Sequence, residues 1–522
     1  MSPLTRLRGP AAEAPPLRLP GAFRVPAGVE RGLHSTWVLP ALILAVAILV
    51  RLWNLDALGY NSDEAVYAGQ AAAIAGDPAL EPLFPAFRAH PLLFQTIVSL
   101  GYYLGDGELF GRLAAVSLGV GTVYLVFALG SVLYGRAVGL VAGLLLALMP
   151  YHVVVTRQVL LDGPMVLWAT LALYTLARFV QLTRPAWLYA TAAALGLAFL
   201  TKETSIVLVG AVYAFLALTP GLRIPRRHLA GSVALLSLLI TAYPLSLMLA
   251  GRTERGGGYL AWQLFRRPNH DWGFYPTVVP VAIGLLVVCG AGLGLWYARR
   301  ESRWKVTLLL SWIVVPAAFF QLWPVKGFQY LLPIAPSIAV LAALGLVRLG
   351  PRSKRLPMTP ALIALVAISL LVATWQQIEP SRSDNFLAGS GGLPGGREAG
   401  DWMEAHVPKG ARIMTIGPSL ANVIQYYAHR QANGLAVSPN PHSRNPAYDP
   451  VRNPDRLIRD NEIQYLVWDA FSSRRSEFFS ERLLRYVDRY HGRAVHSETV
   501  PARTPAGRTA TKPLIVVYEV RP

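Results

Sequence analysis

Long apolar runs dominate the pattern of hydrophobic and polar positions and occupy most of residues 37–377. A helix that crosses a membrane needs about 20 consecutive, mostly apolar residues. The runs predict about eleven crossings, at residues 37–53, 110–133, 137–156, 163–180, 186–200, 205–220, 229–250, 276–298, 306–323, 330–348 and 359–377. The apolar piece at residues 92–104 is too short to span comfortably, so we predict a juxtamembrane or half-inserted helix there.

Basic residues between the runs predict the orientation of the chain, because cytoplasmic loops of membrane proteins are enriched in Lys and Arg. Basic loops fall at alternate connections, as a consistent topology requires, at residues 178–184, 223–227, 299–305 and 348–355. With these loops inside, the outer segments are residues 54–90, 201–204, 251–275, 324–329 and everything after residue 378. Asp162 then lies at the outer face.

The two ends of the chain differ from the apolar region. Residues 1–36 are rich in Pro and Arg and too polar for a cleavable signal peptide, so we predict a disordered basic cytoplasmic tail. Residues 379–396 have the Gly/Ser/Pro composition of a linker. Residues 397–522 predict a small extracytoplasmic α/β domain, with helices at 397–406, 419–429, 453–460 and 476–490 and strands at 412–416, 464–468, 493–496 and 514–520.

Composition supports a membrane protein. Only 15% of the 522 residues are charged, whereas soluble domains carry about a quarter, and 53% are hydrophobic. The fold class predicted is therefore a polytopic α-helical protein of the plasma (inner) membrane, with its transmembrane domain at residues 37–378 and its N-terminus in the cytoplasm.

The net charge of +19 changes this picture little. The Lys and Arg residues lie largely in short loops, which indicates topology and contact with anionic membrane lipids rather than nucleic-acid binding. The single cysteine, Cys289, lies in an apolar run, so neither a disulfide framework nor a cysteine metal site is expected.

Two adjacent carboxylates follow the first predicted crossing, in the segment Gly-Tyr-Asn-Ser-Asp-Glu-Ala-Val-Tyr at residues 59–67. Neighbouring helical residues point about 100° apart, so Asp63 and Glu64 would serve different partners. One carboxylate could take a proton from an acceptor hydroxyl while the other orients a base, a metal or a backbone turn. A helix N-cap formed by Ser62 or Asp63, with Glu64 in the first turn, explains the same residues equally well.

Asp162 is the second candidate, in the segment Thr-Arg-Gln-Val-Leu-Leu-Asp-Gly-Pro at residues 156–164. An ionisable residue among apolar ones at membrane depth indicates function by default. The alternative is a helix cap before Pro164, paired with Arg157.

Cations on the predicted outer loops could stabilise a departing lipid phosphate. They are Lys202, Arg252, Arg255, Arg266, Arg267 and Lys326. Interfacial snorkelling explains the four arginines better. Lys326 is harder to explain that way, because it interrupts an aromatic-rich segment flanked by apolar helices.

A metal site is the least supported chemistry. His270 and Asp271 are adjacent, but two residues do not make a metal site, and an interfacial aromatic belt accounts for Trp272 and Tyr275. We predict no metal ligands and no definite cofactor, and leave a divalent metal as an open alternative.

Several of these motifs together resemble the GT-C superfamily of membrane glycosyltransferases. They are the first crossing, the outer-loop Asp-Glu, His-Pro at 90–91, Leu-Asp-x-Pro at 161–164, Thr-Lys-Glu at 201–203 and the Lys-Gly-x-x-Tyr segment beginning at 326. Within the superfamily the chain is similar to the group of protein O-mannosyltransferases and lipid A aminoarabinose transferases. The similarity covers most of residues 37–350.

The resemblance implies an inverting transfer of sugar from a polyprenyl-phosphate donor to a protein, lipid or cell-envelope glycan at the outer face. Asp63 matches the family's base or acceptor-orienting group, and Glu64 and Asp162 match its other catalytic acids. Donor-phosphate binding is expected at Lys326, Arg157, Lys202 and Tyr330, and substrate binding at His90, His270 and Tyr67.

One position departs from the family pattern. Where the family often has a lysine shortly after His-Pro, this chain has Gln95, which carries no charge. Arg88, Arg157, Lys202 and Lys326 are the candidates to compensate.

Two other classes of function fit the crossings. A lipid-linked sugar transporter or flippase explains the intramembrane charges, but not the carboxylate-bearing outer loop, and we find no repeated halves. A membrane scaffold whose outer domain binds a partner is the other alternative.

Overall fold

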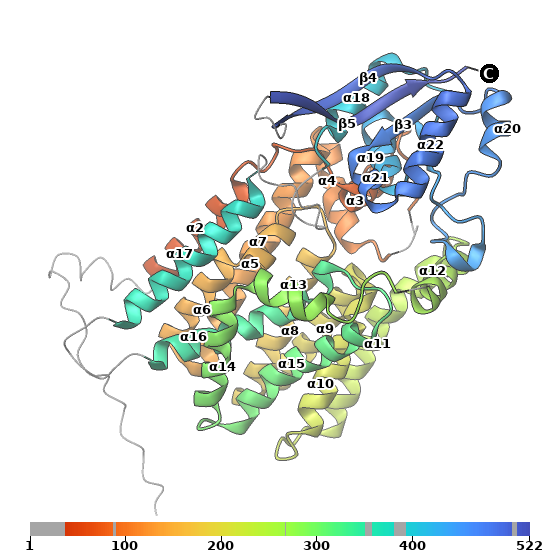
Figure 1. Cartoon of the computed structure of the whole chain (residues 1–522). Coiled ribbons are helices and arrows are strands. Elements are labelled where there is room, and N and C mark those ends of the chain that lie inside the picture. The colour runs from red at the N-terminus through yellow and green to blue at the C-terminus, as the bar shows by residue number, and fades with distance from the viewer. Residues whose placement is uncertain are drawn as a thin grey trace, which may run out of the picture.

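The structure is a computed structural model that describes residues 37–86, 90–266, 268–349, 358–379, 393–503 and 509–521. The predicted N-terminal tail and most of the predicted linker lie outside these residues. A bundle of long helices carries a mixed sheet with its own helices at one end (Figure 1).

Helices make up nearly all of the chain before residue 379. The first are α2 (Val38–Leu52), α3 (Ser62–Ile74), α4 (Leu93–Tyr103), α5 (Gly107–Tyr134), α6 (Arg136–Leu148), α7 (Pro150–Val155), α8 (Asp162–Leu182), α9 (Pro185–Thr201), η1 (Glu203–Ile206), α10 (Val207–Ala217) and α11 (Arg226–Leu249). The next are α12 (Thr253–Phe265), α13 (Phe274–Ile283), α14 (Leu285–Ala298), α15 (Arg303–Leu322), η2 (Phe328–Ile334), α16 (Ala335–Leu349) and α17 (Met358–Ile378).

Six of the described helices are long and apolar enough to cross a membrane, or seven spans if the bent pair α13–α14 counts as one. The other four predicted crossings coincide with shorter apolar helices of 10–17 residues: α2, α6, α9 and η1–α10. The figure of about eleven crossings therefore stays a prediction. The short helix expected at 92–104 is present as α4.

Two predicted crossings are broken rather than continuous helices. Residues 276–298 bend by 91° between α13 and α14, where Gly284 adopts φ +99°, a conformation that glycine tolerates best. Residues 137–156 divide between α6 and α7, because Met149 is extended before Pro150, and proline favours the first position of a new helix.

The region after residue 393, here called the C-terminal region, contains one five-stranded sheet of order β2-β1-β3-β5-β4. Strands β2, β1 and β3 are parallel, and β5 and β4 are antiparallel to their neighbours. The strands are β1 (Arg412–Thr415), β2 (Gln431–Gly434), β3 (Tyr465–Asp469), β4 (Arg493–Arg503) and β5 (Thr509–Glu519). The helices are α18 (Gly396–His406), α19 (Pro418–Ala428), η4 (Pro441–Ser443), α20 (Pro454–Arg459), α21 (Ala470–Arg475) and α22 (Glu477–Arg489).

All four strands and four helices predicted for this region are present, and most of their ends lie within one or two residues of the prediction. The exceptions are β4, which ends at Arg503 and not at residue 496, and β5, which begins at Thr509 and not at residue 514. Strand β2 and helix α21 were not predicted. The β2 sequence Gln-Ala-Asn-Gly lacks the β-branched and aromatic residues typical of strands.

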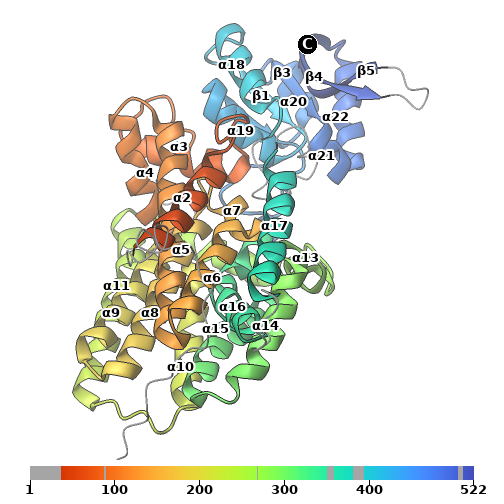
Figure 2. The ribbon, with the colours of Figure 1, turned by 90° about the vertical axis from the view of Figure 1, so that its left-hand side faces the viewer.

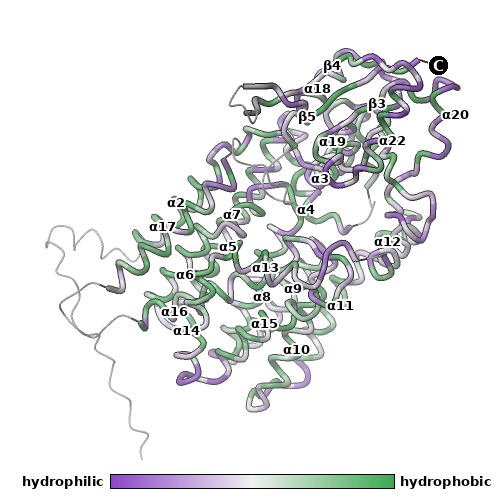
Figure 3. Tube along the Cα trace, viewed as in Figure 1, coloured by the Kyte–Doolittle hydropathy of each residue, from purple (hydrophilic) through white to green (hydrophobic). Residues whose placement is uncertain are grey.

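Hydropathy divides the molecule in the same way. The bundle is mostly hydrophobic along its helices, whereas the C-terminal region and the loops beside it are mixed or hydrophilic (Figure 3). The α10–α11 and α14–α15 connections, two of the basic loops, lie at the end of the bundle away from the sheet (Figures 1 and 2). This arrangement is consistent with the predicted topology, in which those loops share one side of the membrane.

The C-terminal region is anchored to the α2–α3 loop and to the first turn of α5 by polar contacts. The Tyr427 hydroxyl accepts a hydrogen bond from the Tyr60 backbone N–H (2.7 Å) and donates one to the Glu108 carboxylate (2.7 Å). Arg397 forms ion pairs with Glu108 and with Asp56. One continuous hydrophobic core runs from the bundle helices into the C-terminal region, so this region has a fixed position above α3.

We expect Tyr427→Phe to destabilise the protein, because it removes both hydrogen bonds from a largely buried interface. A buried group left without its partner costs about 1–3 kcal/mol. Thermal unfolding of the purified full chain should show a lower midpoint than for Tyr213→Phe, which alters a 74% exposed tyrosine on α10. Equal midpoints for the two variants would contradict this account of the anchoring.

Candidate active site

The first turn of α3 is built around an asparagine cap. The Asn61 side chain accepts hydrogen bonds from the backbone N–H groups of Asp63 (2.9 Å) and Glu64 (3.0 Å), and Glu64 bonds back to the Asn61 N–H (3.1 Å). This reciprocal capping box satisfies N–H groups that a helix start leaves unpaired. A cap was expected here, but the residue is Asn61, not Ser62 or Asp63.

Glu64 is fully buried and occupied by structural contacts. Its carboxylate pairs with Arg112 (3.3 Å) and accepts a hydrogen bond from the Val159 N–H (3.0 Å). Arg112 also donates to three backbone carbonyls of the loop before α3. Glu64 therefore fixes α3 against α5 and the loop before α8, which indicates a positioning role.

Asp63 has a different environment. Its half-buried side chain faces two cavities and, within the described part of the chain, makes no hydrogen bond or ion pair. Burial raises the pKa of the Asp63 carboxyl, while the positive charges of Lys202 and His90 oppose part of that increase. A carboxylate in this state is available to accept a proton.

Asp162 is neutralised by Lys202. The lysine Nζ lies 2.7 and 2.8 Å from the two carboxylate oxygens, and both side chains are buried. The same Nζ lies 4.7 Å from the centre of the Tyr330 ring, a cation–π contact. The alternative pairing of Asp162 with Arg157 is wrong, because Arg157 donates to the Trp53 carbonyl instead (2.6 Å).

His90 belongs to a second polar group beside Asp63. Its Nδ1 lies 2.8 Å from the Glu203 carboxylate, and its Nε2 lies 3.4 Å from the Tyr259 hydroxyl. Tyr67 packs edge-on against the imidazole at 5.9 Å between ring centres. These contacts hold His90 and Tyr67 on one wall of the smaller cavity.

Lys326 is placed by its backbone. Its N–H donates to the Asn269 side chain (2.7 Å), and the Asn269 amide donates to the Lys326 carbonyl (2.8 Å). The Nζ lies 5.6 Å from the centre of the Trp272 ring and makes no ion pair in the described residues. The Nζ also donates a long hydrogen bond to the Trp323 carbonyl (3.5 Å). The segment before η2 therefore presents a cation without a counter-charge in the described residues.

Two cavities meet at Asp63. The inner cavity, about 330 Å³, is lined by aromatic and polar side chains that include Tyr67, His90, Lys202, Tyr259, Trp262 and Tyr330. The basic cavity, about 700 Å³, has Arg266, Lys326, Arg444 and Arg475 in its wall, and Asp63 is the only carboxylate among its described lining residues. Tyr330 and Tyr448 line both cavities.

The structure thus brings together most of the predicted site residues. His270 lines the basic cavity and stacks on Phe274 at 4.0 Å. Arg157 lines neither cavity, and Gln95 is buried against Gln70 (3.2 Å). Arg88, Arg267 and the side chain of Arg255 lie outside the described residues.

Several site residues were not predicted. Arg112 lies inside the predicted crossing at 110–133. A charged residue in a crossing indicates a buried partner of opposite charge, so the sequence does contain a signal for Arg112. Arg266 had been interpreted as snorkelling, but its guanidinium stacks on Trp262 at 4.4 Å inside the basic cavity. Arg444 and Tyr448 carry no local sequence signal, because only the folded C-terminal region brings them to Asp63.

Metal binding gains no support from the described residues, which contain no group of three or more His, Cys, Asp and Glu side chains placed to hold an ion.

The chain is similar in sequence to known proteins. Residues 89–246 match the sequence model of the dolichyl-phosphate-mannose-protein mannosyltransferase family. The chain is 26% identical over 368 residues to an undecaprenyl phosphate-α-4-amino-4-deoxy-L-arabinose arabinosyl transferase of Pseudomonas fluorescens, covering 66% of each chain. The chain is thus similar in sequence to membrane glycosyltransferases of the GT-C superfamily.

Solved structures of other proteins share the fold of this chain. ArnT from Cupriavidus metallidurans superposes with a TM-score of 0.68 at 16% identity, over 94% of this chain and 98% of that one. The oligosaccharyltransferase of Archaeoglobus fulgidus superposes with a TM-score of 0.57 at 13% identity, over 92% of this chain and 74% of that one. Other curated relatives are matched over about half of their length: the Pectobacterium carotovorum transferase, for example, over 48%.

We expect the Asp162–Lys202 pair to be strongly coupled. Asp162→Asn or Lys202→Met leaves an uncompensated buried charge, which costs about 3–5 kcal/mol, while the double variant should lose far less than the sum. A double-mutant cycle on the free energy of unfolding in micelles measures this coupling.

The matched control is the Glu481–Arg485 pair, whose side chains are both 61% exposed. Glu481→Gln and Arg485→Met should show almost no coupling, because solvent screens exposed pairs. Additive losses at Asp162 and Lys202 would contradict the buried ion pair.

Proposed function

We propose that this protein transfers a sugar from a polyprenyl-phosphate donor to an acceptor at the outer face of the plasma membrane, with inversion of the anomeric carbon. The observation that carries the proposal is the placement of Asp63. Its unpaired carboxylate lies where an aromatic cavity meets a basic one.

The basic cavity fits a lipid phosphate. Lys326, Arg266, Arg444 and Arg475 give it a strong positive charge, and charge-assisted hydrogen bonds to phosphate are among the stronger polar contacts. ArnT from Cupriavidus metallidurans, which shares the fold, has been solved bound to undecaprenyl phosphate. In this chain Lys326 and Arg266 line the basic cavity together with Asn269 and Tyr330.

The inner cavity fits the sugar. Tyr67, Tyr259 and Tyr330 offer ring faces and hydroxyls, and His90 and Gln263 add hydrogen-bonding groups. Aromatic side chains with polar tips suit a ligand that has apolar C–H faces and hydroxyl edges. A sugar in this cavity with its phosphate in the basic cavity would place the anomeric carbon near Asp63.

The reaction is a single displacement. The acceptor oxygen attacks the anomeric carbon, the bond from that carbon to the phosphate oxygen breaks, and polyprenyl phosphate leaves with the electron pair. Asp63 takes the proton of an acceptor hydroxyl as the new bond forms. Lys326 and Arg266 stabilise the charge that develops on the phosphate.

Glu64 and Asp162 act as positioning residues in this scheme. Glu64 holds the first turn of α3 through Arg112, and Asp162 holds Lys202 beside Tyr330. His90, fixed by Glu203, orients the sugar from the other wall. The N-terminus is cytoplasmic and the C-terminal region lies outside, where a protein, lipid or glycan acceptor can reach the site.

Asp63→Asn should lower the rate of transfer by about 10²–10⁴-fold, the usual contribution of a general base. Release of free polyprenyl phosphate, measured in membranes that contain donor and acceptor, follows the reaction. Glu254→Gln, which alters an exposed carboxylate on α12, is the control and should retain full turnover.

The pH dependence of turnover provides a second test of Asp63, with the same variant. Because the base must be ionised and burial raises its pKa above 3.8, wild-type turnover should fall as the pH drops through the Asp63 pKa. The residual turnover of Asp63→Asn should lack this acid limb. Full turnover in that variant, or an unchanged acid limb, would remove Asp63 from the proposed role.

Lys326→Gln should weaken the binding of undecaprenyl phosphate roughly 10- to 100-fold, since a hydrogen bond to a charged group contributes about 1.5–3 kcal/mol. Quenching of tryptophan fluorescence is a suitable measurement, because Trp272 lies beside the lysine. Lys409→Gln, at an exposed lysine outside the cavities, should bind like wild type. Equal affinities for both variants would exclude Lys326 from the phosphate site.

A further inference from the structure

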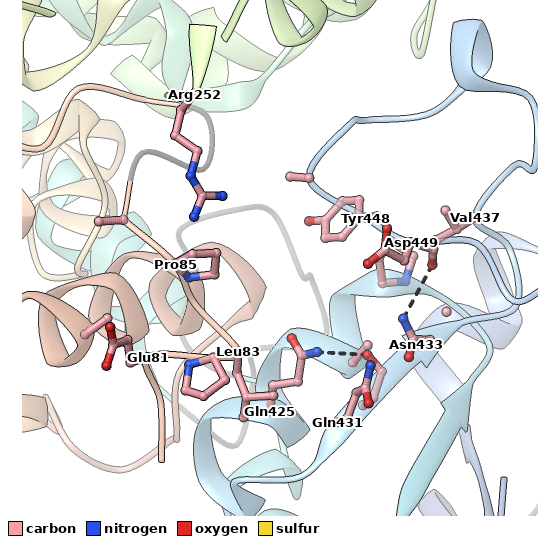
Figure 4. Close-up of a pocket in the computed structure, with 18 of the residues that line it drawn as sticks. Glu81, Leu83, Pro85, Arg252, Gln425, Gln431, Asn433, Val437, Tyr448 and Asp449 are labelled. Atoms are coloured by element: carbon pink, nitrogen blue, oxygen red, sulfur yellow. Dashed lines mark hydrogen bonds between the residues drawn. The ribbon is translucent and has the colours of Figure 1, made fainter. Parts of the chain in front are cut away.

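A third cavity, here called the amide cavity, lies between the first outer loop and the C-terminal region. Its volume is about 870 Å³, within the range of about 300–1,000 Å³ typical of small-molecule sites. Figure 4 shows Glu81, Pro85 and Arg252 facing Gln425, Gln431, Asn433, Tyr448 and Asp449 across it. None of the reaction steps above uses this cavity.

Primary amides are the main polar side chains of its C-terminal wall. The Gln425 side-chain N–H donates a hydrogen bond to the Ala432 carbonyl (3.0 Å). The Gln425 side-chain oxygen is left as an acceptor for a ligand. The exposed Gln431 amide makes no hydrogen bond in the described part of the chain. Each amide offers donors and an acceptor together, as a sugar hydroxyl requires of its partner.

The described lining of the amide cavity carries one more negative than positive side chain, in contrast to the basic cavity. Arg252 is its one described cation, and Glu81 and Asp449 are its carboxylates. A phosphate or carboxylate ligand would meet two like charges here, whereas the basic cavity next to it would attract the ligand strongly. The lining therefore favours an uncharged ligand rich in hydroxyls.

A hydrogen-bonded path runs from this cavity to Ser62, the residue before the base. The buried Asn422 amide donates to the Tyr448 hydroxyl (3.1 Å) and to the Ser62 hydroxyl (3.0 Å). Ser62 directly precedes Asp63 on α3, and Tyr448 lines the amide, inner and basic cavities alike. A ligand in the amide cavity that passes Tyr448 thus reaches the side of the inner cavity where Asp63 lies.

We propose that the amide cavity binds the acceptor, and that the acceptor is an uncharged, polyhydroxyl glycan. This inference rests on the proposed function, since it supplies the hydroxyl that Asp63 deprotonates. Pro82, Leu83 and Pro85 give the opposite wall apolar surface for the C–H faces of sugar rings. The size of the cavity admits several sugar units, so the acceptor is the end of an oligosaccharide chain.

Photo-crosslinking in the cell's own membrane captures the natural acceptor, whichever glycan it is. A benzophenone amino acid replaces Gln431 on one wall and, in a separate full-length variant, Glu81 on the other; both positions are exposed. The same replacement at Lys409, on the exposed surface outside the cavity, is the control. Thermal unfolding of each variant establishes that it is folded.

After irradiation and proteolysis, mass spectrometry should find the same neutral-sugar adducts at positions 431 and 81, at least tenfold above position 409. Adducts that carry phosphate or carboxylate groups, phospholipid adducts alone, or yields equal to the control would overturn the inference. A second variant with Asp63→Asn added should keep the adducts while turnover is lost, because acceptor binding precedes proton transfer.

The two proposals fail differently. Turnover of donor by the wild-type chain without neutral-glycan adducts would overturn the acceptor assignment alone. Neutral-glycan adducts without any release of polyprenyl phosphate would overturn the proposed transfer and leave a glycan-binding membrane protein.

Discussion

Carboxylates buried at the edge of a hydrophobic bundle are costly unless a cation or several hydrogen bonds compensate them. The site follows this constraint closely: Glu64 pairs with Arg112, Asp162 with Lys202 and Glu203 with His90. These three acids are thereby fixed in place. Asp63 makes no such contact in the described residues and is only attracted by Lys202 and His90 at longer range. The chemistry assigned to Asp63 depends on this difference, since a carboxylate that is already paired is a poor proton acceptor.

The C-terminal region completes the site and does more than cover it. Arg444 and Arg475 enter the basic cavity from that region, and Tyr448 lines all three cavities. The contacts of Tyr427 and Arg397 anchor this region and so hold these side chains in a fixed position relative to α3. Donor and acceptor would therefore be held by different parts of the chain, the donor mainly by the bundle and the acceptor by the interface.

The sequence predicts those features that depend on local patterns. Run lengths locate most bundle helices, and the position of Asp63 after the first crossing marks the outer loop as a candidate site. It does not predict the 91° bend at Gly284, which depends on a single backbone angle. Nor does it predict contacts between distant segments, such as the bond from Asn422 to Ser62 across 360 positions, because no local pattern encodes the approach of two surfaces.

The central claim is that the donor phosphate lies in the basic cavity within reach of Asp63. A cryo-electron microscopy structure of the full chain in lipid nanodiscs with added undecaprenyl phosphate tests it most directly. The account predicts phosphate density between Lys326 and Arg266, with the prenyl chain leading into the bilayer. Phosphate density at the end of the bundle that carries the α10–α11 and α14–α15 loops, with the basic cavity free of it, would contradict the account.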